Sequence, residues 1–284
     1  MGLMTGTGPL GLHPAGQFNF EPPAPGRAIY VEPSPKRVRV MVGDEVVADS
    51  RRTILLHESG SQPVYYFPPE DVRQDLLEPS DTVTHCPKKG DASYRSIRVG
   101  ERVATDALWL YPEPLAGAPP IAGLVAFYWD RVDRWLEEEE EVFYHPRDPY
   151  HRIDILASSR QVRVLRKHTL LAESDHAMVL FETGLPPRYY LPRGDVDAEL
   201  QPSDRVTGCP YKGTASYFSV VVDGHVVDDI VWTYADPRPE ARPVMGLLAF
   251  YDERVDVELD GVPQERPESP WSAKNAAPPS LTRG

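Results

Sequence analysis

Hydrophobic and polar positions alternate with a period of two along much of the chain. Val38, Val40 and Val42 fall on one side of this pattern, while Arg39 and Met41 fall on the other. Such alternation is typical of a half-buried β-strand. The same reasoning predicts strands over 53–56, 64–67 and 124–128, a hairpin over 97–103 that turns at Gly100-Glu101, and an equivalent segment over 220–227. The Asp-Gly pair at 223–224 favours a tight turn with positive φ, so the last of these ranges predicts a hairpin.

Helical segments are predicted to be short. The only two candidates are Pro68–Leu77 and Pro192–Leu200, and each opens with a proline, which suits the first turn of a helix. The 31 prolines and 20 glycines of the chain also indicate short elements separated by many turns. The pattern therefore predicts an all-β, mainly antiparallel fold with short helices only.

The pattern occurs twice. Val162-Arg163-Val164 repeats Val38-Arg39-Val40, an offset of 124 residues, and Pro202-Ser203-Asp204 repeats Pro79-Ser80-Asp81, an offset of 123. One residue has therefore been lost between these points in the second copy. Each copy is about 100 residues long, far beyond the roughly 20–50 residues of a solenoid repeat, which indicates two tandem domains.

The flanks and the junction differ in composition from the repeats. Gly, Pro, Ala and Ser dominate both ends of the chain, which predicts disordered tails. The junction carries aromatic residues, so we expect it to pack on a domain, with its run of glutamates at 137–141 as a solvated face. The predicted segments are a tail at 1–33, a first repeat domain at 34–134, an acidic and aromatic connecting segment at 135–157, a second repeat domain at 158–261 and a tail at 262–284.

Charge and composition restrict the partners. The chain has 30 Lys and Arg against 43 Asp and Glu, a net charge of −13, which argues against binding to nucleic acid or to an anionic membrane surface. We expect neither a membrane span nor a secretory signal. Two cysteines cannot form a disulfide scaffold, so a reducing, cytoplasmic location is expected.

Each repeat carries one cysteine, followed by proline and then by a lysine three positions on. The pairs are Cys86 with Lys89 and Cys209 with Lys212. One thiol per domain cannot supply a closed zinc site, so no metal and no cofactor are expected. Two interpretations are open: the lysine activates the thiol as a catalytic nucleophile, or the cysteine is a small buried hydrophobe. A histidine adjoins the cysteine only in the first copy, as His85.

The Lys-Gly pairs and the recurring aromatic residues are candidates for a binding cleft. Lys89 could bind an anion, or it could cap a turn with Asp91. Trp109 and Tyr111 share one strand face because they are two residues apart, whereas Tyr65 and Tyr66 must point to opposite faces. The predicted ligand-binding residues are Glu58, Tyr66, Lys89, Ser93, Tyr94, Trp109 and Tyr111 in the first repeat, and Glu182, Tyr190, Lys212, Ser216, Tyr217, Trp232 and Tyr234 in the second. An ion pair between Glu58 and Arg39 is the alternative for that glutamate.

The ordered motif set resembles a known family. Tyr-Tyr-x-Pro, Pro-Ser-Asp, Cys-Pro-x-Lys-Gly-x-Ala-Ser-Tyr, Trp-x-Tyr and Ala-Phe-Tyr-x-x-Arg-Val-Asp, over 30–133 and 154–260, resemble the bacterial domain of unknown function 427, which is sometimes labelled a nucleotidyltransferase. The resemblance implies a small domain of two β-sheets meeting at an angle, similar to the tent-like fold of methionine sulfoxide reductase B. The first repeat departs from the family pattern at Lys88, where tyrosine is usual, and at Arg95, where an aromatic residue is usual.

The function expected from these features is the binding of a small organic ligand in an aromatic-lined cleft of each domain. The alternatives are an enzyme, either thiol-dependent or transferring a nucleotidyl group, and a protein–protein interaction module. Because the second repeat keeps Tyr211 and Phe218, its cleft is predicted to bind better, whereas the first should be wetter and more cationic and prefer an acidic ligand or none. The repeats would form an internal pseudo-dimer, so no oligomer is required.

Overall fold

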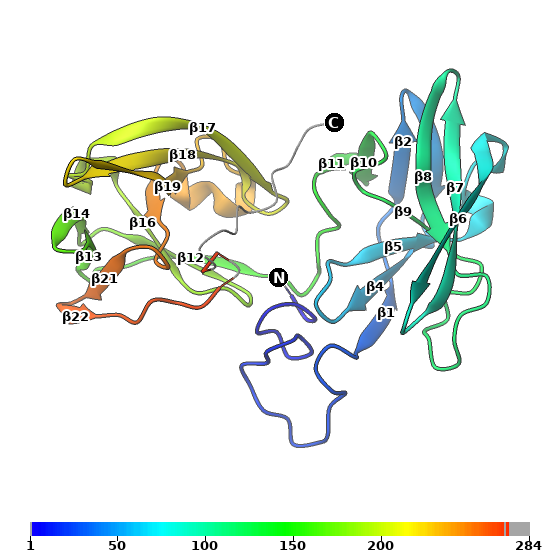
Figure 1. Ribbon diagram of the computed structural model, residues 1–284, viewed down its shortest axis with the longest axis horizontal. Helices are drawn as coiled ribbons and strands as arrows, with labels where there is room; N and C mark the ends of the chain where they lie inside the picture. Colours follow the sequence, from blue (N-terminus) through cyan, green and yellow to red (C-terminus); the bar gives the residue numbers. More distant parts are fainter. Residues whose placement is uncertain (1, 270, 273–284) are drawn as a thin grey trace. The chain divides into compact units, whose positions relative to one another are not determined.

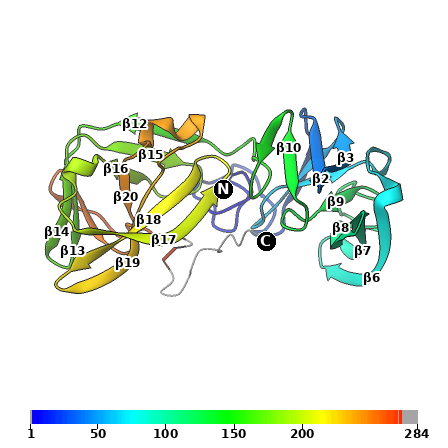
Figure 2. The same ribbon diagram turned by 90° about the horizontal axis from the view of Figure 1, so that it is seen from above.

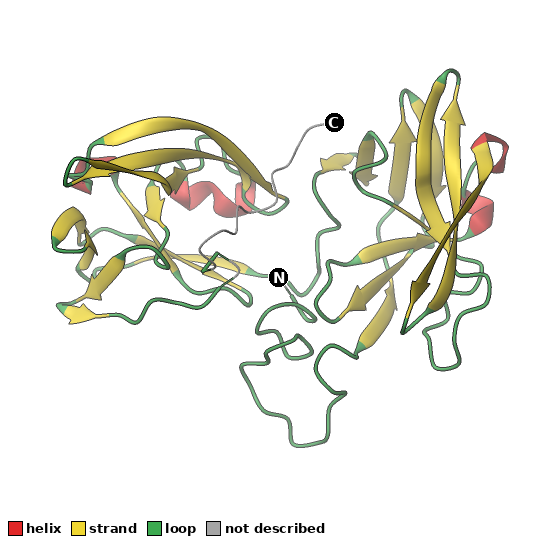
Figure 3. Cartoon of the chain, viewed as in Figure 1, coloured by secondary structure: helices red, strands yellow, loops and turns green. Residues whose placement is uncertain are grey.

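The computed structural model describes residues 2–269, 271 and 272 (Figure 1). The chain divides into two compact units, Met1–Tyr150 and His151–Gly284. Strands and short helical turns make up the regular structure of both units (Figure 3).

The first unit contains two antiparallel sheets. The larger sheet has the order β1-β4-β5-β9-β8-β7-β6 and the smaller one β11-β10-β2-β3. The strands of the larger sheet are β1 (Ile29–Pro33), β4 (Ile54–Glu58), β5 (Val64–Phe67), β6 (Leu77–Cys86), β7 (Gly90–Val99), β8 (Arg102–Leu110) and β9 (Val125–Phe127). Those of the smaller sheet are β2 (Val38–Val42), β3 (Glu45–Ser50), β10 (Arg134–Glu137) and β11 (Glu140–Val142).

The second unit repeats this topology. Its larger sheet has the order β12-β15-β16-β20-β19-β18-β17 and its smaller sheet β14-β13-β21-β22. The strands are β12 (Ile153–Ala157), β13 (Val162–Arg166), β14 (Thr169–Ser174), β15 (Met178–Glu182), β16 (Arg188–Leu191), β17 (Leu200–Cys209), β18 (Gly213–Val222), β19 (His225–Thr233), β20 (Leu248–Phe250), β21 (Asp256–Leu259) and β22 (Val262–Pro263). Strands β17, β18 and β19 lie side by side (Figure 2). Cys86 and Cys209 end the corresponding strands β6 and β17, which confirms the duplication.

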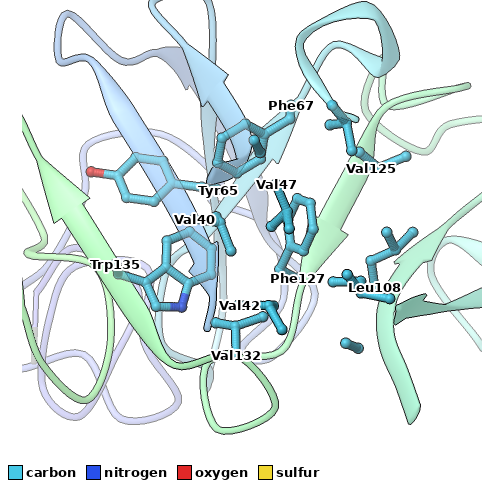
Figure 4. Close-up of a cluster of buried hydrophobic side chains, with 14 of the residues drawn as sticks. Val40, Val42, Val47, Tyr65, Phe67, Leu108, Val125, Phe127, Val132 and Trp135 are labelled. Atoms are coloured by element: carbon cyan, nitrogen blue, oxygen red, sulfur yellow. The ribbon is translucent and has the colours of Figure 1, made fainter. Parts of the chain in front are cut away.

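Strand alternation gives each larger sheet two apolar faces. In the first unit one face packs with the smaller sheet around Val40, Phe67, Leu108 and Trp135 (Figure 4). The other face carries a second cluster, which includes Tyr66. The two corresponding clusters of the second unit are built in the same way. The second face of each larger sheet therefore collects the candidate site residues.

The helical predictions were too long. Only 3₁₀ turns form there: η1 (Pro69–Asp71) and η2 (Gln74–Leu76) in the first unit, and η3 (Arg193–Asp195) in the second. The residues after these turns enter strands β6 and β17, because long-range pairing to β7 and β18 overrides local propensity. A further 3₁₀ helix, η4 (Pro239–Val244), was not predicted.

Four sheet strands fall wholly or mostly outside the two predicted repeat domains. Strand β1 lies within the predicted N-terminal tail, β11 and β12 lie within the predicted connecting segment, and β10 begins one residue before that segment, yet all four are sheet strands. The segment before β1 also folds against the first unit, since the Ser59 hydroxyl donates to the Leu10 carbonyl at 2.6 Å and Met4 is buried. In the C-terminal tail, β22 pairs with β21, while residues 270 and 273–284 lie outside the described part.

The glutamate run is not uniformly solvated. Glu137 is buried, where it pairs with Lys36 and accepts a hydrogen bond from the Tyr65 hydroxyl at 2.8 Å. The following residues turn the β10–β11 hairpin, with Glu138 at a φ of 52°. Within the described residues, helices are all too short to cross a lipid bilayer.

Candidate functional site

A cavity of about 220 Å³ opens on the second face of the larger sheet in the first unit. Its wall combines residues from β4, β5, β6, β7, β8 and the loops beside them. The lining residues are Leu56, Glu58, Ser61, Gln62, Val64, Tyr66, Thr84, Lys89, Tyr94, Trp109, Tyr111 and Tyr128. Six of the seven residues predicted from the first repeat are therefore brought together.

Aromatic rings form one wall of this cavity. Tyr94 and Tyr128 stack with ring centroids 6.2 Å apart, and their hydroxyl oxygens lie 3.2 Å apart. The ring centroid of Trp109 lies 4.5 Å from that of Tyr128 and 6.4 Å from that of Tyr66, which it meets edge to face. The Thr84 hydroxyl holds the Tyr94 hydroxyl at 2.8 Å. Such a wall offers a flat apolar surface with hydroxyl groups at its edge.

Two lysines share the Glu58 carboxylate on the polar side of the cavity, and of the two only Lys89 lines the cavity. Lys89 forms an ion pair with one carboxylate oxygen of Glu58, and Lys88 pairs with the other oxygen at 2.7 Å. Burial alone would raise the pKa of Glu58, but the hydrogen bonds and charges of both lysines lower it below its ordinary value. Since one carboxylate faces two ammonium groups, one positive charge is left over at this site.

The Lys-Gly motif has a backbone cause. Gly90 has a φ of +101°, and a Cβ atom there would lie 3.4 Å from the Glu113 carbonyl oxygen. The glycine lets the chain turn directly after Lys89 into β7, which places the lysine against Glu58. Gly213, with a φ of +96°, starts β18 in the same way. Lys89 therefore contacts Glu58, whereas Asp91 pairs with His85 at 2.6 Å.

Cys86 lies beside the cavity as a partly buried free thiol. It forms a hydrogen bond with Tyr111, whose pKa is raised by burial first and then by the neighbouring Tyr66 and Cys86. The imidazole of His85 instead pairs with the exposed Asp91. Cys86 packs against the aromatic cluster of the second face, as a small hydrophobic residue would.

The second unit reproduces the aromatic cluster. Tyr217 and Tyr251 stack with ring centroids 6.4 Å apart, and the ring centroid of Trp232 lies 4.7 Å from that of Tyr251. The Trp232 indole N–H donates to the Tyr190 hydroxyl at 3.0 Å. Tyr234 is buried as well, and burial raises its pKa well above the ordinary value. The equivalent aromatic residues of the two repeats thus keep equivalent contacts.

In the second unit a single lysine faces the corresponding carboxylate. Glu182 pairs with Lys212 on one oxygen and with the His151 ring nitrogen at 3.1 Å on the other. Burial would raise the pKa of Glu182, but the Lys212 charge and the hydrogen bonds from His151 and Lys212 lower it well below its usual range. Tyr211, at the position of Lys88, stacks on His151 at 3.9 Å.

Arg188 changes the second site further. It stands where the first repeat has Val64, is buried, and forms ion pairs with Asp252 at 3.3 Å and with Glu253. Its guanidinium lies 5.8 Å from the ring centre of Trp232. A cavity of about 180 Å³ in this unit is lined by other residues, among them Tyr189, Val257 and Pro267, and by none of the predicted ligand-binding ones.

Three sequence expectations are corrected by the structure. Ser93 and Ser216 lie between residues that face the aromatic cluster, so alternation turns them to the other side of the sheet. Arg39 pairs with Glu139 at 2.9 Å rather than with Glu58. Phe218 packs on the inter-sheet core, so of the two departures from the family pattern only Lys88 reaches the charge cluster of the site.

The described cavity that contains the predicted residues lies in the first unit, whereas the sequence predicts better binding in the second, and that order of affinity stays a prediction. The sequence prediction did not include several residues that line the first cavity or contact the second aromatic cluster. Thr84 and Tyr128 recur as Thr207 and Tyr251, so the repeat alignment contained their signal. His151 and Arg188 have no counterpart of the same type in the first repeat, so no repeat signal marks them.

Among the described residues, no cluster of three or more His, Cys, Asp or Glu side chains is arranged to hold a metal ion. The topology and the duplicated aromatic site define a class, the tandem all-β proteins with two sheets per repeat. More particularly, the chain belongs to the family described as Domain of unknown function (DUF427), which matches residues 30–138 and 154–261. No curated protein matches the chain.

Proposed function

We propose that this protein binds a small organic molecule with an acidic group in the cavity of the first unit. The observation that carries the proposal is that Trp109, Tyr94 and Tyr128 line the same cavity as the Glu58–Lys89 pair. Lys88 adds a second ammonium group to that pair from outside the lining. An apolar cleft with a few convergent polar groups is the usual form of a small-molecule site.

The size of the cavity supports a ligand of modest size. Pockets for drug-sized molecules span about 300–1,000 Å³, and a cavity of about 150 Å³ accommodates benzene. The 220 Å³ of this cavity therefore suits a molecule of one or two rings. The unbalanced lysine charge favours an anion such as a carboxylate, because a carboxylate would complete the ion pairing.

The enzymatic alternatives gain less support from the site. The Ser50 hydroxyl donates to Asp71 at 2.6 Å, and the Ser174 hydroxyl donates to Asp195 at 2.5 Å. Nucleotidyl transfer would require clustered carboxylates that bind a divalent metal ion. Asp71 and Asp195, at equivalent positions of the two repeats, instead accept hydrogen bonds from serine hydroxyls. For thiol chemistry, a histidine base would have to approach Cys86, and His85 pairs with Asp91.

The test is binding of a library of small carboxylic acids, measured by thermal shift and then by calorimetric titration. Trp109→Ala should abolish the binding of any hit, while the matched variant Trp232→Ala should leave it unchanged. Lys88→Tyr, which copies the second repeat, should weaken acidic ligands more than their neutral amides. Binding that survives Trp109→Ala, or a library without hits, would overturn the proposal.

A further inference from the structure

Trp271, from the segment that follows the second repeat, lies against the aromatic cluster of the second unit. Its ring centroid is 6.5 Å from that of Tyr251, and it packs on the cluster that contains Tyr217 and Trp232. The Arg188 guanidinium lies 5.7 Å from the Trp271 ring centre and 5.8 Å from that of Trp232. Two indoles thus flank one buried cation.

A specific turn presents this indole. The Ser269 hydroxyl accepts a hydrogen bond from the Trp271 backbone N–H at 3.1 Å and donates to the Glu253 carboxylate. Glu253 also pairs with Arg188. Since Arg188 contacts Trp271 as well, the segment is attached to the site through both a hydrogen bond and a cation–π contact.

The residues that Trp271 contacts are the counterparts of cavity-lining residues in the first unit. Tyr251 corresponds to Tyr128, and Arg188 corresponds to Val64, and both Tyr128 and Val64 line the open cavity. The first unit has Asp130, an exposed residue, where Glu253 stands. The same aromatic cluster is therefore covered by an indole in one repeat and open in the other.

We propose that Trp271 is an internal occupant of the second site, and that the first site takes a planar aromatic molecule of indole size with an acidic substituent. This inference rests on the proposed function and narrows its ligand class. The aromatic wall is the shared part, since Tyr94, Trp109 and Tyr128 keep the spacings of Tyr217, Trp232 and Tyr251. The acidic substituent would pair with the additional positive charge of Lys88, which the second site lacks.

Two titrations of the full chain test the inference. In the first, indole-3-acetate is compared with cyclohexylacetate, an acid of similar reach without the flat ring. Indole-3-acetate should bind one site per chain and about tenfold more tightly, since aromatic contacts add to burial. If cyclohexylacetate or other small acids bind and indole-3-acetate does not, the ligand class is wrong while the proposed function stands. If no acid binds at all, the proposed function itself fails.

In the second titration, 3-methylindole is added to Trp271→Ala. The unfolding midpoint of this variant should rise with 3-methylindole, and a second binding site should appear that the natural chain lacks. Trp232→Ala combined with Trp271→Ala is the matched control and should lose that site. Should Trp271→Ala not fold, Ser269→Ala removes the attachment to Glu253 and should bind 3-methylindole more tightly than the natural chain. Equal binding by natural and variant chains would overturn the internal-occupant assignment.

Discussion

At the scale of single residues, the glutamate–lysine pairs of the two sites differ in how many charges surround them. Glu182 has one ammonium partner and is 9% exposed, whereas Glu58 has two lysines. We predict that Lys212→Met lowers the free energy of unfolding of the second unit by about 3 kcal/mol, because it leaves a buried carboxylate without its cation. The matched variant Lys89→Met should cost about 1 kcal/mol, because Lys88 still pairs with Glu58. Urea unfolding of both variants measures these two losses of free energy, and equal losses would contradict the prediction.

Asp252 gives the second unit a pH dependence. Its burial raises its pKa from 3.8 to about 7, in spite of the neighbouring Arg188. A carboxyl with a raised folded pKa keeps its proton in the folded unit after the unfolded chain has released it, so the stability it contributes is lost as the pH rises from about 4 to 7. We predict that this loss, on the order of a few kcal/mol, is absent in Asp252→Asn. Urea unfolding midpoints over a pH series would show it, and parallel profiles would refute it.

At the scale of elements, the outermost strands of the larger sheets determine where each repeat begins. Strand β12 pairs with β15 over five residues, and Ile153 and Ile155 pack on the aromatic cluster of the second unit. We predict that an isolated chain starting at residue 158 is less stable and more prone to aggregate than one starting at His151, because it exposes the edge of β15. Thermal unfolding and light scattering of the two chains test this. Indistinguishable behaviour would show that β12 is dispensable.

At the scale of the whole molecule, each hydrophobic cluster draws its described residues from one unit only. A unit with its own core is expected to unfold as a unit. We predict that Leu108→Ala, at a fully buried position, lowers only the transition of the first unit, by about 3 kcal/mol. Val231→Ala should lower only that of the second unit. Calorimetry separates the transitions, and a shift of both by either variant would contradict independent units.

Strand alternation and duplication were predictable from the residues. A period of two requires Tyr65 and Tyr66 to face opposite ways, and the structure places Tyr65 in the inter-sheet core and Tyr66 in the cavity wall. The same rule puts Trp109 and Tyr111 on the side of the cavity. Such side-chain placement depends only on local strand geometry, which a linear pattern records.

The sequence by itself therefore determined the strand pattern, the two copies and the aromatic and charged residues that gather in each. Only the tertiary structure decided which copy is open. That choice depends on Arg188, His151 and Trp271, which come from separate strands and loops and have no counterpart of the same type in the first copy. It also decided the repeat boundaries, because β1 and β12 are strands only through hydrogen bonds to β4 and β15. Contacts between distant segments leave no period in the chain, so no linear pattern predicts them.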